Sequence, residues 1–210
     1  MNITTSPLYG GIHLPADDWS VVYDCLTGGV SVEPDAHTQA WTKAETGTVV
    51  SAASNGMFNL ATAAHTDGCL YTFADTDFST DEGVLIEALL YMDSSASSAD
   101  MGAALGIEAG ENAAVAYLRT GGLNLDGMEN VAVDLTGWHW VRVALQGDEL
   151  RVYVDDLLVQ SSYAPSYVTC NKRALFGIIA NDGPADVTWR YVRARRLALE
   201  ETLGISTIVA

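Results

Sequence analysis

The sequence predicts an all-β fold, an antiparallel jelly-roll β-sandwich of two sheets. One observation is a hairpin pattern between Trp138 and Val159, where apolar and polar residues alternate on both sides of a turn. A second is the lack of sustained helical periodicity, since only Leu197–Leu203 fits a helical turn or two. Because a lone hairpin is marginal in water, its apolar face needs a second layer, which favours a sandwich.

The hairpin is the clearest element of the chain. Its two strands carry apolar residues at alternate positions, which are Val141, Val143 and Leu145 in the first and Leu150, Val152 and Val154 in the second. The turn Gln146–Glu149 contains Gly147, which adopts a positive φ without steric cost. The segment Val131–Leu135 leads through Gly137 into this hairpin.

Further short strands are separated by turn residues along the rest of the chain. Asn55-Gly56 is the strongest two-residue hairpin signal. In Gly83–Met92, Ile86 and Ala88 face one way, while Glu87 and Tyr91 face the other. The other expected strands are Trp19–Tyr23, Gly47–Ala53, Met57–Ala63, Cys69–Phe73, Met101–Glu108, Ala113–Arg119, Ala174–Ala180 and Val187–Arg195.

The two ends of the chain differ from the expected sandwich at 19–204. Residues 1–18 are rich in Pro and Gly and indicate an extended arm. Residues 205–210 form an apolar tail beyond the last expected strand, with Ile205, Ile208 and Val209. An apolar, β-prone tail is an aggregation hazard unless it is covered, so we predict that it joins the sheet edge of a neighbour in an assembly. The alternative is that both ends fold back on their own sandwich.

Composition and charge exclude several classes of partner. Ten Lys and Arg face 27 Asp and Glu, which gives a net charge of −17. This charge repels phosphate backbones and anionic lipid, so we expect neither a nucleic acid nor a membrane as partner. Cys25, Cys69 and Cys170 lack the spacing of metal ligands and are expected to be buried as small apolar residues. The first residues lack a signal-peptide pattern, which predicts a cytoplasmic location unless the protein belongs to a particle.

Two stretches carry a resemblance to a known family. The first is WHWVRV, from Trp138, with the Leu-x-x-Tyr-Val-Asp pattern that ends at Asp155; the second runs from Asp186 to Gly204. Together they resemble the laminin-G-like and pentraxin-like domains of the concanavalin A-like lectin/glucanase superfamily. The resemblance implies a jelly-roll sandwich. It leaves function open, because this fold carries lectins, glycosidases, lyases and inert assembly modules.

Catalytic motifs are weak in this sequence. The retaining glucanases that the chain resembles carry closely spaced carboxylates on one strand. The nearest approach here, Glu87 and Asp93, lies roughly 20 Å apart at about 3.3 Å per residue, and a solvated strand face explains it better. Lyases of the superfamily use Arg, His and Tyr together. The basic cluster Arg190–Arg196 and His139 is better explained by pairing with the chain's own acids and by packing. We therefore expect no enzyme activity.

A metal site is the stronger candidate. Asp75, Asp77, Asp81 and Glu82 lie close together in an expected loop, and hard oxygen ligands at such spacing suit Ca²⁺. Asn181, Asp182 and Asp186 form a second, weaker candidate. The alternative is that these are ordinary solvated acids, which a chain of this charge contains by chance.

Aromatic residues provide candidates for glycan binding, because the apolar face of a sugar stacks on a ring. Trp138 and Trp140 share a parity opposite to Val141, and Tyr153 has the outward parity of the facing strand. These three residues are the candidate glycan platform. The alternative is that most tryptophans lie in the core.

These features lead to one hypothesis of function. We predict a non-catalytic recognition or assembly protein, an accessory structural protein on the surface of a phage or virus particle, as a capsid decoration or in the tail, with possible glycan binding. Its partners are then protein neighbours, either further copies of itself or other virion proteins. The alternatives are a carbohydrate-binding module of a bacterial protein and, less favoured, a glycosidase or polysaccharide lyase.

Overall fold

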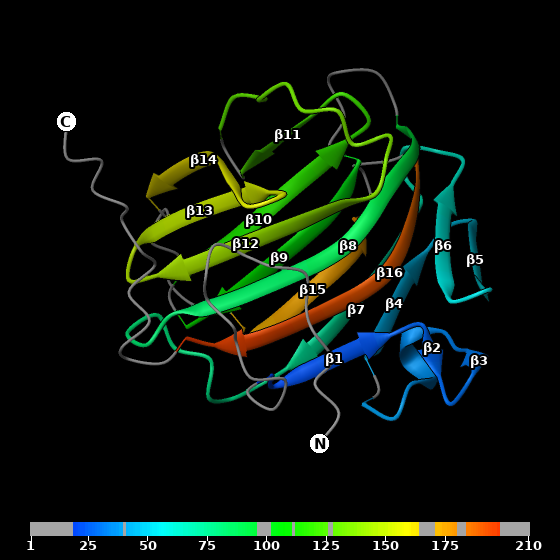
Figure 1. Ribbon diagram of the computed structural model, residues 1–210, viewed down its shortest axis with the longest axis horizontal. Coiled ribbons are helices and arrows are strands. Elements are labelled where there is room, and N and C mark those ends of the chain that lie inside the picture. The colour runs from blue at the N-terminus through cyan, green and yellow to red at the C-terminus, as the bar shows by residue number, and fades with distance from the viewer. Residues whose placement is uncertain are drawn as a thin grey trace.

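The computed structural model describes residues 19–39, 41–95, 102–110, 112–125, 128–163, 171–179 and 184–197. In Figure 1 these residues form two antiparallel sheets packed face to face, with the larger sheet in front. The prediction of a two-sheet antiparallel β-sandwich is therefore confirmed.

The larger sheet has eight strands. Seven of them follow one another in the order β14 (Leu157–Tyr163), β13 (Glu149–Val154), β12 (His139–Gln146), β8 (Val84–Ser95), β16 (Ala185–Arg196), β6 (Met57–Thr62) and β5 (Val49–Ser54). The eighth, β1 (Val21–Asp24), pairs with the second half of β16, whereas β6 pairs with the first half. Both long strands, β8 and β16, therefore lie at the centre of the sheet.

The smaller sheet has six strands. Their order is β11 (Gly122–Leu125), β10 (Asn112–Arg119), β9 (Ala103–Ala109), β15 (Arg173–Ile178), β7 (Gly68–Ala74) and β4 (Thr42–Thr46). A ribbon of β2 (Leu26–Thr27) and β3 (Val30–Ser31) and a short 3₁₀ helix, η1 (Pro34–Ala36), connect β1 to β4.

The predicted turns form as expected. Asn55 and Gly56 both have positive φ, at 54° and 72°, and join β5 to β6 in a two-residue hairpin. Gly147 has φ 60° in the turn between β12 and β13. The segment Val131–Leu135 makes a single bridge, from Val131 to Leu123, rather than a strand. Leu135 then joins the two sheets, because its amide bonds Thr120 and its carbonyl accepts from Met92.

Aromatic rings fill the centre of the core. Phe176 contacts Tyr23, Trp41, Tyr71 and Trp189, with ring centroids 4.9 to 6.0 Å apart. The expectation that tryptophans lie in the core holds for Trp41 and Trp189, which are fully buried. Cys25 and Cys69 are also buried and free, and burial raises the pKa of Cys69 to about 11. Both are therefore small packing residues, as predicted, whereas Cys170 lies outside the described residues.

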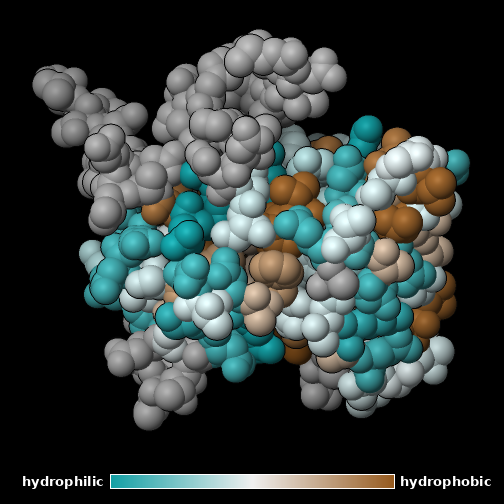
Figure 2. All heavy atoms as spheres, turned by 90° about the horizontal axis from the view of Figure 1, so that it is seen from below, coloured by the Kyte–Doolittle hydropathy of each residue, from teal (hydrophilic) through white to brown (hydrophobic). Residues whose placement is uncertain are grey.

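The two sheets are joined at one edge by a side chain. Gln160 of β14 accepts a hydrogen bond from the amide of Leu125 at 2.7 Å and donates to the carbonyl of Glu129 at 2.9 Å. The side-chain amide of Gln160 thus bonds the backbone of β11 in place of a neighbouring strand. At the opposite end, Figure 2 shows hydrophobic residues on the surface where β2, β3 and β5 lie; the exposed ones are Leu26, Val30 and Val50.

Candidate functional site

The outer face of the larger sheet, which points away from the smaller sheet, holds most of the chemistry of the described residues. Ile86 and Val143 face the core, so their neighbours Glu87 and Arg142 face outward. The register then aligns four outward residues in one row across the sheet: Tyr153, Arg142, Glu87 and Arg193. A second row holds Trp140, Leu89 and Tyr191.

Glu87 is the centre of this face, and its environment differs from the expectation. A solvated strand face was predicted for it, but Glu87 is only 1% exposed. Arg142 Nε donates to one carboxylate oxygen at 3.2 Å, and Arg193 Nε donates to the other at 2.6 Å. The prediction was wrong because arginines on both neighbouring strands cover the carboxylate. The finding that Arg193 pairs with an acid agrees with the expected role of the basic cluster.

Aromatic rings hold the two arginines in place. The guanidinium of Arg193 lies 4.0 Å from the ring centroid of Trp19, 5.7 Å from that of Trp140 and 5.6 Å from that of Tyr191. Arg142 lies 5.8 Å from the centroid of Tyr153. Cation–π contacts of this kind stabilise a charge away from water. This half of the face is therefore a rigid set of charges and rings that are already paired with one another.

The other half of the outer face is more open. Trp138 precedes β12, and the register places it beside Tyr91, with ring centroids 4.7 Å apart in an edge-to-face arrangement. Trp138 is 42% exposed, whereas Trp140 and Tyr153 are half-buried. The structure therefore brings the three predicted platform residues to one face, and Trp138 offers the largest free ring surface among them.

A polar network lies next to the Trp138–Tyr91 pair. Thr188 Oγ1 donates to Asp93 at 3.0 Å, and Asn59 Nδ2 donates to Asp186 at 2.6 Å and to Thr188 at 3.2 Å. The register pairs Thr188 with Tyr91, so this network and the aromatic pair are neighbours. Asp93 remains exposed. Rings beside carboxylate and amide groups can stack on a sugar and bond its hydroxyls.

His139 lies at the entrance to β12, close to these groups. Its Nδ1 is 2.7 Å from a carboxylate oxygen of Asp155, whose other oxygen accepts from the amide of Trp140 at 3.0 Å. Asp155 has a positive φ of 48° in the turn after β13. These contacts fix that turn against the start of β12. The predicted packing role of His139 fits this arrangement.

The predicted calcium loop is organised by its own backbone. The amide of Asp77 bonds the Asp75 side chain at 2.9 Å, and Asp81 bonds Ser79 at 3.3 Å. Arg196 lies 3.9 Å from both Asp77 and Glu82. Within the described ranges, no three acidic, His or Cys side chains gather as a metal ion requires, and this includes Asp75, Asp77, Asp81 and Glu82. Calcium binding therefore stays a prediction.

The second calcium candidate and the assembly residues lie partly or wholly outside the described residues. Asp186 belongs to the polar network above, whereas Asn181 and Asp182 are not described. Residues 1–18 and the tail with Ile205, Ile208 and Val209 also lie outside. The predicted role of the chain ends in assembly stays a prediction.

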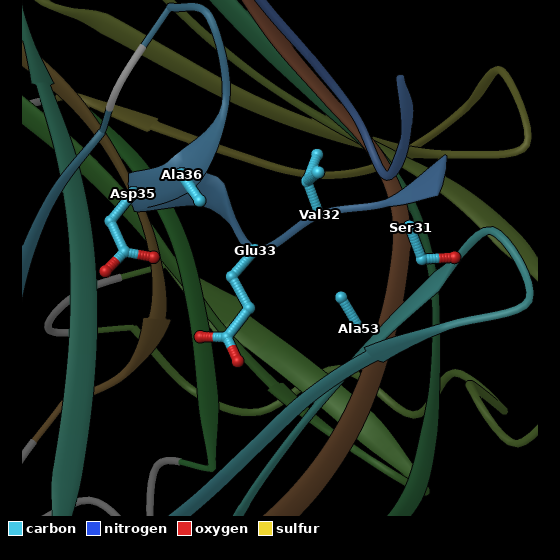
Figure 3. Close-up of a pocket in the computed structure, with 6 residues that line it drawn as sticks. All are labelled: Ser31, Val32, Glu33, Asp35, Ala36 and Ala53. Carbon is cyan, nitrogen blue, oxygen red and sulfur yellow. The ribbon is translucent and has the colours of Figure 1, made fainter. Parts of the chain in front are cut away.

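A shallow depression of about 470 Å³ lies at the edge of the larger sheet formed by β5, far from the edge formed by β14. Figure 3 shows the segment from Ser31 to Ala36 on one side of it and Ala53 of β5 on the other. Two carboxylates line the depression, those of Glu33 and Asp35. The carboxylate of Glu33 accepts a hydrogen bond from the Ser51 hydroxyl at 3.2 Å, so it already has a partner. None of its lining residues is aromatic, so the depression offers less ring surface than the outer face.

Sequence reasoning found part of the outer face. Alternation along β8 put Tyr91 on the same side as Glu87, but its contact with Trp138 depends on the pairing of β8 with β12. Trp19 and Tyr191 were missed as members of the face. The alternation of arginines after Tyr191 was a usable signal, since rings commonly cover buried arginines.

Comparisons with known proteins show similarity in fold but not in sequence. No protein-family model and no curated protein sequence matches the chain. Among solved structures, it is similar to a carbohydrate esterase from the Shiga toxin-encoding bacteriophage phi24B, with 10% identity and a TM-score of 0.57, over 85% of this chain and 98% of that one. It is also similar to a structure of botulinum neurotoxin type C, whose cell entry depends on interaction with two ganglioside molecules, with 13% identity and a TM-score of 0.56.

A third similar structure is the binding domain of botulinum neurotoxin DC in complex with SialylT, with 10% identity and a TM-score of 0.54. The matches cover 88% of this chain but only 49% of each toxin chain, so this chain spans about half the length of those proteins. The β-sandwich is shared. In the described part of the chain, no helix is long and apolar enough to cross a lipid bilayer.

Proposed function

We propose that this protein is a non-catalytic glycan-binding protein that holds a sugar at the Trp138 end of its outer face. The observation that carries the proposal is the exposed ring of Trp138 beside Tyr91, next to the polar network of Asp93, Thr188 and Asn59. A sugar stacked on Trp138 would have Asp93 in reach of its hydroxyls. The similar fold in proteins that act on carbohydrate or interact with gangliosides supports this reading.

The proposal excludes catalysis at Glu87. This carboxylate accepts from two arginines and is covered by them, so it has no access to a substrate bond. Asp93 bonds Thr188 on the same strand face, well away from Glu87. A retaining glycosidase needs two carboxyl groups about 5–5.5 Å apart on either side of the scissile bond. Hydrolysis through this pair does not fit that requirement.

The finer part of the proposal is the setting, an accessory protein on the surface of a phage or virus particle. The acidic charge, the recognition-type fold and the similarity to a bacteriophage protein support it. The alternative setting is a carbohydrate-binding module of a bacterial protein. Mass spectrometry of purified particles would decide between them, because only a virion protein copurifies at a fixed stoichiometry with the capsid.

A glycan array, with and without a chelator, tests the binding proposal. Trp138→Ala should weaken saturable binding about fivefold, since losing a ring stack costs on the order of 1 kcal/mol and 1.4 kcal/mol is a factor of ten. Val50→Ala, at an exposed site on β5, is the matched control and should leave binding unchanged. Binding that survives Trp138→Ala would place the site elsewhere, and silence on the array would favour a purely structural role.

An enzyme assay on the same material tests the non-catalytic part. Incubation with a polysaccharide panel, followed by reducing-end and unsaturated-uronate assays, should give no turnover. Turnover that is abolished by Glu87→Gln or His139→Ala would overturn the proposal.

A further inference from the structure

Strand β14 is an exposed, uncharged edge of the larger sheet. It pairs with β13 and with no other strand among the described residues, so one side of its backbone faces outward from the sheet. Its seven residues, LLVQSSY, include no charged residue, although 18% of the chain is charged. Leu157 and Tyr163 are each 73% exposed and Leu158 is 54% exposed. Edge strands normally carry charges or Pro that prevent pairing with another chain.

The strand has one irregularity, a register shift against β13 next to Val159. From Gln160 to Tyr163 the pairing with β13 is regular, so the backbone groups on the other side of this half can pair with a further strand. On its inner side Gln160 and Ser162 already bond the neighbouring loop, at Glu129 and Met128. Leu158, Ser161 and Tyr163 face outward, as their partners on β13 do.

We propose that β14 pairs with β14 of a second copy of this chain, which joins two larger sheets into one. Charge supports this choice of occupant. Two copies at −17 each repel one another, so they can approach closely only where the contact surface lacks acids. β14 meets this condition along its whole length, and Glu149 on the adjoining strand is paired with Arg151 at 2.7 Å.

The other edge strand, β5 (VVSAAS), is also uncharged, but its one exposed large apolar side chain is Val50, whereas β14 exposes Leu157, Leu158 and Tyr163. Strand direction then decides how a second copy meets β14. All described neighbours in this sheet are antiparallel, and an odd number of strands leads from β14 to β5, so both edge strands point the same way. A copy added through β5 would meet β14 in parallel. A copy rotated about a two-fold axis perpendicular to the sheet meets it through β14 in the antiparallel sense that the rest of the sheet uses. Two-fold dimers are also the commonest symmetric assembly.

This geometry has a consequence for the outer face. A two-fold axis perpendicular to the sheet keeps both outer faces on the same side, so both copies of Trp138 would face the same surface. Two linked sites raise the overall affinity for a repeated ligand without any new contact. The pairing itself does not depend on glycan binding and can be tested without a glycan.

Sedimentation and light scattering over a range of concentrations test the pairing. The wild-type protein should approach twice its chain mass of 22.3 kDa. The double variant Leu158→Lys/Ser161→Lys places four positive charges together across the axis and should remain monomeric. Val50→Lys, on the other edge strand and 60% exposed, is the matched control and should still dimerise. All substituted side chains are exposed, so circular dichroism spectra that match the wild type should show that the fold is intact.

Other occupants give different results. If the tail of a neighbour covers β14, deletion of Ile205–Ala210 abolishes the dimer, whereas pairing of the two strands survives this deletion. A wild-type protein that stays monomeric, a dimer that persists in Leu158→Lys/Ser161→Lys, or a dimer lost on tail deletion would each overturn the proposal. Hydrogen exchange gives a second readout, because the amides of β14 should become protected as concentration rises.

Discussion

Glu87→Gln is the sharpest test of how the outer face is held together. The substitution keeps the shape of the side chain but removes its charge, and so leaves Arg142 and Arg193 facing a neutral amide. Glu87 is 1% exposed and its two partners lie within hydrogen-bond distance. Breaking a buried ion pair by removing one partner typically costs about 3–5 kcal/mol, because a charge is left without compensation.

The expected loss lies at the lower end of that range. The side chains of Arg142 and Arg193 are 21% and 13% exposed, so water reaches both when the carboxylate charge is gone. Arg142 also keeps a contact of 3.5 Å with Asp156. We therefore expect a loss of about 3 kcal/mol. For a chain of this size that corresponds to a fall of roughly 6–12 °C in melting temperature, at about 2–4 °C per kcal/mol.

Urea denaturation followed by circular dichroism measures this loss, with Glu149→Gln as the control. Glu149 belongs to the same sheet and also pairs with an arginine, but its side chain is 40% exposed. Its partner Arg151 is only 10% exposed, but water reaches the carboxylate of Glu149, so losing this charge should cost less than losing that of Glu87. A loss for Glu87→Gln no larger than that for Glu149→Gln would refute the reasoning. A gain in stability would show that Glu87 is kept for a ligand or a reaction rather than for the fold.

Two further predictions concern the sheet edge and the acidic loop. Gln160→Leu should cost about 1–3 kcal/mol in urea denaturation, because the amide of Leu125 and the carbonyl of Glu129 lose their partner; an unchanged midpoint would mean that water replaces the side chain. If the Asp75–Glu82 loop binds calcium, millimolar Ca²⁺ should raise the melting temperature by mass action and Asp77→Ala should remove the response; no shift would leave these acids to their contact with Arg196.

The strands that sequence reasoning found are those with two paired neighbours or regular alternation. The core face of β8 is buried from Val84 to Met92 and that of β12 from Val141 to Leu145, so apolar residues recur at every second position of the sequence there. β14 and β4 were not predicted. β4 has a single neighbour, and four of its five residues are exposed. The register shift in β14 breaks its alternation. An edge strand is specified by its partner rather than by its own pattern, which explains why both were missed.

The site shows the same limit in another form. A charged residue at an outward position of a strand normally faces solvent, and this led to the wrong prediction for Glu87. The two arginines that bury it lie 55 and 106 residues away in the sequence. Their approach depends on the order of β12, β8 and β16 in the sheet, and local alternation contains no information about that order. Trp138 was placed on the outer face correctly because the parity of β12 extends to this residue just before the strand.

The outer face has a rigid half, around Arg193, and an accessible half, around Trp138, and a binding site needs both rigidity and access. At the Arg193 end, Trp19, Trp140 and Tyr191 surround a guanidinium that is bound to Glu87, so these side chains lose their freedom when the chain folds rather than when a ligand arrives. At the Trp138 end, an exposed ring stands beside Asp93, and the basic groups of the face are committed elsewhere. The local charge there is negative, which disfavours acidic sugars. If the proposed glycan site lies here, we therefore expect it to prefer neutral glycans, whose hydroxyls can donate to the Asp93 carboxylate.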